Sequence, residues 1–153
     1  MPTSNDNAFV AFYRGFGEYY EKKWDQAGAD FERAYALDLS ILQVKIGKAL
    51  SDGLKRRNAQ GLGLLREVEN KIEDRGVGDP EALYKIAQAY ALLGDKPSAM
   101  RVLRHSIERG FFPYPHFSTD PLLDSLRAQA EFPQLMENAR QRYEAFRSRF
   151  FGN

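Results

Sequence analysis

Small residues recur through this chain at a helical spacing, and they restrict the folds it can adopt. Three of them are separated by 34 and 38 residues, and a large apolar residue follows each one four positions later. The three pairs are Ala27 with Phe31, Gly61 with Leu65, and Ala99 with Leu103. A spacing of four residues puts both members of a pair on the same face of an α-helix. The pattern therefore predicts three similar helices, each with a small residue where another helix can approach closely.

A second set of small residues lies upstream of each pair and predicts the partner helices. These residues are Gly15, Gly47 and Ala87. One pair of helices cannot bury its own apolar face, so successive pairs are expected to stack. The predicted fold class is all-α, an antiparallel helix-pair solenoid of about three units followed by C-terminal capping helices.

The expected helices cover most of the chain. They span about residues 8–22, 24–37, 40–54, 59–75, 79–93 and 96–109. Asp79-Pro80 is typical of an N-cap followed by proline in the first turn, and Lys96-Pro97 is interpreted in the same way. Gly110 is expected to end the sixth helix.

The repeat resembles the tetratricopeptide repeat, a helix–turn–helix unit of about 34 residues, from roughly Asn7 to Gly110. The third unit, with Gly94-Asp95 at its turn, matches best, and the second has an altered turn. The resemblance implies a concave groove lined by the first helix of each unit. The groove residues expected by matched position are Phe9, Phe12, Phe16, Tyr19, Tyr20, Lys48, Asp52, Tyr84, Gln88 and Leu92. An amphipathic or aromatic-containing peptide suits such a groove.

The C-terminal segment differs from the repeats. Two prolines are expected to exclude helix from Phe111–Phe117, and a short helix from Asp120-Pro121 and a longer one from Pro133 should follow. The longer helix has an apolar stripe, formed by Leu135, Ala139, Tyr143, Phe146 and Phe150. The predicted organisation is a disordered tail at 1–7, a repeat array at 8–110, and an aromatic loop with capping helices at 111–153.

Three stretches of this segment resemble the segment that closes tetratricopeptide arrays in many bacterial proteins. They are Arg109-Gly110-Phe111-Phe112, Thr119-Asp120-Pro121-Leu122-Leu123-Asp124-Ser125-Leu126-Arg127 and Phe132-Pro133-Gln134-Leu135. Such arrays often follow a serine/threonine kinase domain or a winged-helix domain. The resemblance implies two alternatives for function. One is a non-catalytic scaffold that binds a protein or peptide in the groove. The other is a regulatory or dimerisation module of a larger bacterial signalling protein.

Composition narrows the remaining classes of function. Lys and Arg (22) nearly balance Asp and Glu (21), which gives no general electrostatic attraction to nucleic acid or to an anionic membrane. Cysteine is absent, and the two histidines, His105 and His116, do not belong to a metal-ligand motif. The sequence also has no phosphate-binding loop motif. The chain has no apolar run of membrane-spanning length. We therefore expect a cytoplasmic protein that is not an enzyme and uses no cofactor or metal.

The first predicted helix has more apolar residues than its own core requires. Residues 8–13 are all apolar or aromatic, whereas a terminal repeat helix normally has a polar outer face. Three explanations remain open: the helix meets a second copy of the chain, it has lost an upstream repeat or domain that covered it, or its face holds a ligand.

Overall fold

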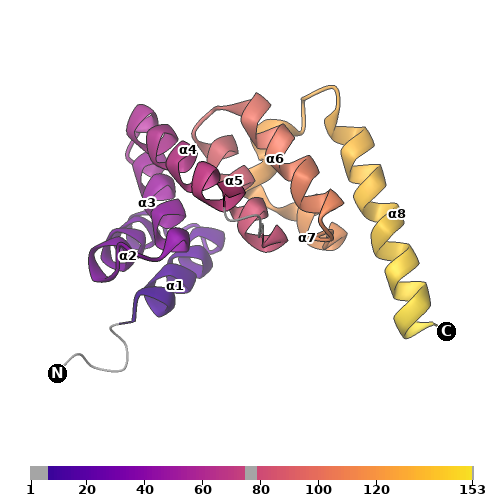
Figure 1. Ribbon diagram of the computed structural model, residues 1–153, viewed down its shortest axis with the longest axis horizontal. Coiled ribbons are helices and arrows are strands. Elements are labelled where there is room, and N and C mark those ends of the chain that lie inside the picture. Colours follow the sequence, from indigo (N-terminus) through magenta and orange to yellow (C-terminus); the bar gives the residue numbers. More distant parts are fainter. Residues whose placement is uncertain (1–6, 75–78, 153) are drawn as a thin grey trace. The chain divides into compact units, whose positions relative to one another are not determined.

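The computed structural model describes residues 7–74 and 79–152, which contain helices and no strand (Figure 1). The helices are α1 (Ala8–Tyr20), α2 (Trp24–Leu37), α3 (Leu42–Leu54), α4 (Asn58–Asp74), α5 (Pro80–Leu92), α6 (Lys96–Glu108), α7 (Tyr114–Thr119), the 3₁₀ helix η1 (Pro121–Leu126) and α8 (Phe132–Phe151). The all-α prediction is confirmed. The disorder predicted for residues 1–6 and the helix end predicted at residue 75 both fall outside the described residues.

The chain divides into two compact units. Unit 1 is Met1–Val77 with Leu92–Gly94, and unit 2 is Gly78–Ala91 with Asp95–Asn153. This division differs from the predicted boundary at residue 110, since it places most of α5 and all of α6 with the C-terminal helices. In unit 1 each helix from α1 to α4 packs against the next one in sequence, and α1 also contacts α3 (Figure 1).

Close packing around one buried ring fixes the centre of unit 1. A Cβ atom added at Gly15 would lie 2.8 Å from the ring of Phe31, and one added at Gly47 would lie 2.9 Å from the same ring. Phe12 and Phe16 pack with their ring centroids 5.1 Å apart, and Phe16 lies 5.3 Å from Phe31. The predicted close approach is therefore observed at Gly15 and Gly47, because a Cβ atom at either position would collide with the ring of Phe31.

The helix caps agree with one prediction and correct another. The Asp79 carboxylate accepts a hydrogen bond from the Glu81 N–H at 3.0 Å, as expected for an N-cap. For α6 the N-cap is Asp95, which accepts from the Ser98 N–H at 3.2 Å, and not Lys96. Lysine has no acceptor atom on its side chain and cannot satisfy the free N–H groups of a first turn.

The segment after α6 contains a helix that the sequence did not predict. Gly110 has a φ angle of 107° and ends α6, as expected. The following residues then form α7, with Pro115 in its first turn. A first-turn residue needs no hydrogen-bonded N–H, so proline is compatible with helix at this position. The expectation that Phe111–Phe117 excludes helix is therefore wrong for its second half.

Only the first half of α8 is buried in unit 2. Phe132, Leu135 and Ala139 are buried, whereas Phe146 is 45% exposed and Phe150 is 60% exposed. The apolar stripe is continuous along the helix, but the chain covers only its N-terminal part. The apolar stripe is therefore buried at the start of α8 and exposed at its end.

Candidate functional site

Most residues expected to line the groove are buried within their own unit. Those with little or no exposed surface are Phe12, Phe16, Tyr19, Asp52, Tyr84 and Gln88. Phe9 and Tyr20 are exposed, and Lys48 and Leu92 are partly exposed. A buried side chain offers no surface to a partner. Six of the ten residues therefore belong to the interior of this structure, and the prediction that they line a groove is wrong for them.

Five of the six exposed residues of α1 are uncharged, and the sixth is Arg14. Val10, Tyr13 and Tyr20 are 44%, 53% and 37% exposed, and Phe9 beside them is 42% exposed. Gly17 completes this face, and a Cβ atom there would meet no other atom within 4 Å. We call these five residues the α1 face. An exposed group of large apolar side chains on one helix is typical of an interaction surface.

One edge of the α1 face is polar: Arg14 is ion-paired there, whereas the buried Oε2 atom of Glu18 has no hydrogen-bond partner among the described residues. Arg14 donates two hydrogen bonds to the carboxylate of Asp30 on α2. Burial, together with the nearby Asp30 carboxylate, raises the pKa of Glu18. The α1 face itself contains no charged side chain, and the side chain of Arg14 at its edge is 42% exposed.

Lys48 and Asp52, two of the expected groove residues, belong to an ionic network in unit 1. Lys48 Nζ lies 2.6 Å from Asp52 Oδ1, and Arg57 Nε donates to the same oxygen at 3.0 Å. All three residues line a shallow, open hollow of about 610 Å³ next to Gly63 of α4. Because these side chains pair with one another, the hollow has no exposed set of like charges that would select a ligand.

Glu32 extends this network at the side of α2. It accepts hydrogen bonds from Ser51 Oγ at 2.9 Å and from Lys55 Nζ at 3.1 Å. Burial raises the pKa of Glu32, but the hydrogen bonds from Lys55 and Ser51 and the nearby Lys48 outweigh it and lower the pKa to about 2. The carboxylate is therefore ionised and paired at neutral pH, which is the arrangement of a structural ion pair.

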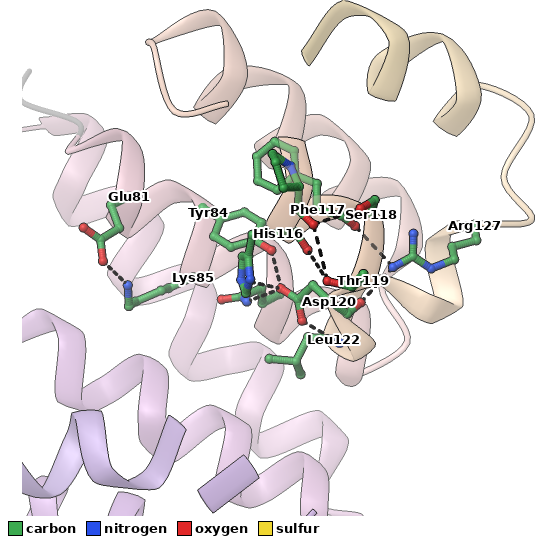
Figure 2. Close-up of polar contacts among 12 residues, drawn as sticks. Glu81, Tyr84, Lys85, His116, Phe117, Ser118, Thr119, Asp120, Leu122 and Arg127 are labelled. Carbon is green, nitrogen blue, oxygen red and sulfur yellow. Dashed lines mark hydrogen bonds and ion pairs between the residues drawn. The ribbon is translucent and has the colours of Figure 1, made fainter. Parts of the chain in front are cut away.

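The carboxylate of Asp120 in unit 2 is buried and lies among side chains of α5 and α7 (Figure 2). Asp120 accepts hydrogen bonds from Tyr84 Oη and from Gln88 Nε2, the latter at 2.6 Å. It also accepts from the Leu122 N–H at 2.9 Å, and His116 Nε2 lies 3.4 Å from Oδ2. Tyr84 and Gln88 thus point at Asp120 and not into a groove. We call these five residues the Asp120 cluster.

Hydrogen bonding determines the charge state of the Asp120 cluster. Burial alone would raise the pKa of Asp120, but hydrogen bonds from His116, Tyr84, Leu122 and Gln88 outweigh it and hold the pKa below its usual range. Tyr84, Gln88 and His116 contact the Oδ2 atom of this carboxylate, and the Leu122 N–H donates to its Oδ1 atom. The cluster therefore joins α5 to α7 and η1.

The exposed half of α8 is aromatic and basic. Arg147 lies over the ring of Tyr143, and Arg149 lies over the ring of Phe150, with charge-to-centroid distances of 5.9 and 5.4 Å. Arg142 donates to the Ile107 carbonyl oxygen at 3.2 Å, which holds the middle of α8 against α6. The surface of this half-helix thus combines rings with positive charge.

Neither a metal centre nor a known relative assigns a function to the chain. Within residues 7–74 and 79–152 no group of three His, Asp or Glu side chains is placed to hold a metal ion. No described helix is long and apolar enough to cross a membrane. The chain matches no protein-family model, no curated protein and no solved structure.

The sequence indicated some of these features and missed others. Val10 and Tyr13 were part of the apolar run at residues 8–13, but the groove expectation omitted them because they do not match groove positions of the repeat. Asp120 was expected to start a helix, and it does so as the N-cap of η1. No local pattern linked Asp120 to Tyr84 or Gln88, because these contacts join residues more than thirty positions apart.

Proposed function

We propose that this chain is a protein-interaction module, built from antiparallel helix pairs of the tetratricopeptide kind, that binds a protein partner through the α1 face. The observation that supports this most directly is the exposure of Phe9, Val10, Tyr13 and Tyr20 on one uncharged helical surface. Large aromatic side chains supply most of the binding energy at protein interfaces. The proposal keeps Phe9 and Tyr20 from the expected groove and replaces the six buried residues with Val10, Tyr13 and Gly17.

The internal packing of unit 1 fits this role. Phe12, Phe16 and Phe31 anchor α1 firmly, so its outer face is held on a rigid element. A rigid surface loses little conformational freedom when a partner binds, which favours affinity. The aromatic residues of α1 therefore divide into a buried set that holds the helix and a more exposed set that we assign to binding.

A photo-crosslinking amino acid tests the proposal even when the partner is unidentified. The full chain carries the crosslinker at position 13, and the matched control carries it at the exposed residue Asn70 of α4, both in a lysate of the source organism. We expect discrete protein adducts from position 13 that are absent from position 70. Adding Tyr13→Lys chain as competitor should not reduce these adducts, whereas wild-type chain should. Equal labelling from both positions, or none from position 13, would overturn the proposal.

A further inference from the structure

The carboxyl group of Glu18 lies where α1 packs against α2, and one of its oxygens is buried without a hydrogen bond. No N–H or O–H group of the described residues donates to Glu18 Oε2. Folded proteins pair nearly all of their buried polar atoms, and an unpaired buried oxygen that carries charge is especially unfavourable. The position of Glu18 therefore disfavours an ionised carboxylate.

The cations near Glu18 are bound to other carboxylates. Arg14 lies one turn before Glu18 on the same face of α1. It donates two hydrogen bonds to Asp30, and the one from Nη2 to Oδ1 is 2.5 Å long. Lys23, in the turn after α1, is ion-paired with Glu21. Both cations act on Glu18 through their charge, but neither forms a hydrogen bond to its buried Oε2.

α3, the other helix packed against α1, uses its lysines for other ion pairs. Lys45 pairs with Glu67 of α4, and Lys48 pairs with Asp52 of α3 itself. The charged groups that act most strongly on Glu18 therefore come from α1, α2 and the turn between these two helices.

Asp30 of α2 is the acidic neighbour of Glu18. Its side chain is buried, and a hydrogen bond joins the two carboxyl groups. An ionised carboxylate only accepts hydrogen bonds, so a bond between two carboxyl groups requires a proton on one of them. Arg14 already donates to both oxygens of Asp30, which favours Asp30 as the ionised member. Burial, the charge of Asp30 and this hydrogen bond together raise the pKa of Glu18, so Glu18 is the group that holds the proton.

We infer that Glu18 of α1 and Asp30 of α2 share one proton across the helix pair, and that unit 1 releases this proton when α1 separates from α2 at neutral pH. Arg14 balances the single negative charge that remains on the two carboxyl groups. The contact between α1 and α2 is thus sensitive to pH, and it is strongest in the protonated form.

The direction of the pH dependence follows from the pKa of Glu18 in the folded and unfolded chain. An unfolded glutamate has a pKa of about 4.3, and folding raises the pKa of Glu18. The contribution to stability is complete below the unfolded pKa and is lost as the pH rises through the folded pKa. Asp120 in unit 2 has the opposite sign, because folding lowers its pKa. A fall in pH should therefore stabilise the α1–α2 contact and destabilise the Asp120 cluster.

An NMR titration of isotope-labelled glutamate carboxyl groups in the full chain tests where the proton is held. Glu18→Gln removes one signal and so identifies that of Glu18. We expect this signal to titrate at a higher pH than that of Glu21, whose side chain is 61% exposed. Asp30→Asn should lower the Glu18 midpoint, because it removes the neighbouring negative charge and frees Arg14 to pair with Glu18. A Glu18 midpoint at or below that of Glu21, or one that Asp30→Asn leaves unchanged, would overturn the shared proton.

Urea denaturation over a range of pH tests the effect on stability. Glu18→Gln matches the shape of the protonated carboxyl group, and its amide can donate to Asp30 at any pH. We expect its urea midpoint to equal that of wild-type chain at about pH 4 and to exceed it by a growing margin up to about pH 8. Glu21→Gln is the matched control and should show no growing margin, because the Glu21 side chain faces water beside Lys23.

Asp120 is present in all the chains compared, so its titration cancels from the differences in urea midpoint. Hydrogen exchange of wild-type chain and Glu18→Gln at the same pH should locate the gain in α1 and α2. A Glu18→Gln chain that is no more stable than wild type at about pH 8 would overturn the inference, as would an equal margin for Glu21→Gln.

Discussion

In unit 1 the rings of Phe12, Phe16 and Phe31 pack on one another and on glycine, whereas in unit 2 the rings of Tyr84 and Phe117 pack beside a buried carboxylate. The first arrangement depends on shape, because any added methyl group collides with a ring. The second depends on complete hydrogen bonding, because a lost partner leaves a buried polar atom unsatisfied. The two units should therefore respond to different kinds of substitution.

The largest expected effect is in the Asp120 cluster. Asp120→Ala leaves Tyr84, Gln88 and the Leu122 N–H without their acceptor in a buried site. We expect a loss of about 4 kcal/mol in the free energy of unfolding, as for breaking a buried polar network. Urea denaturation measures the loss, and hydrogen exchange by mass spectrometry should localise it to α5, α7 and η1. Faster exchange in α1–α3 as well would remove the distinction between the units.

A smaller loss is expected from a single methyl group in unit 1. Gly47→Ala places a Cβ atom 2.9 Å from the ring of Phe31 and 3.0 Å from that of Phe12. We expect a net cost of about 2 kcal/mol from overpacking, with faster exchange confined to unit 1. Gly63→Ala is the control and should stabilise by about 0.5–1 kcal/mol, because it gains helix propensity without a collision.

Acid should affect the Asp120 cluster through its charge. The pKa of Asp120 is lowered in the folded chain, so the carboxylate contributes stability above its unfolded pKa of about 4. That contribution is lost as the pH falls through the folded pKa. We expect the urea midpoint of wild-type chain to fall below about pH 4, and that of Asp120→Asn to fall less. Parallel pH profiles for the two chains would show that the carboxylate charge contributes nothing.

The contrast between shape-dependent packing and hydrogen bonding also explains which parts of the fold and of the candidate site could be predicted from the sequence. Helices and close contacts at Gly15 and Gly47 follow from periodic small and large residues, which is local information. The buried and exposed stripes of α1 could not be told apart in this way, because both are aromatic: Phe12 and Phe16 face inward, and Phe9 and Tyr13 face outward. The Asp120 cluster was invisible because its hydrogen bonds depend on the tertiary fold.

The smallest effect is expected at the end of α8, and it tests whether that end belongs to the fold of the single chain. Phe150 continues the stripe of Leu135 and Ala139 but is 60% exposed, whereas Phe117 is fully buried beside Tyr84. Phe150→Ser should change the free energy of unfolding by less than about 0.5 kcal/mol, and Phe117→Ser should cost about 3 kcal/mol or more. Urea denaturation at two protein concentrations measures both. A cost for Phe150→Ser that matches Phe117→Ser at low concentration would contradict its exposure, because a ring facing water has little apolar contact to lose.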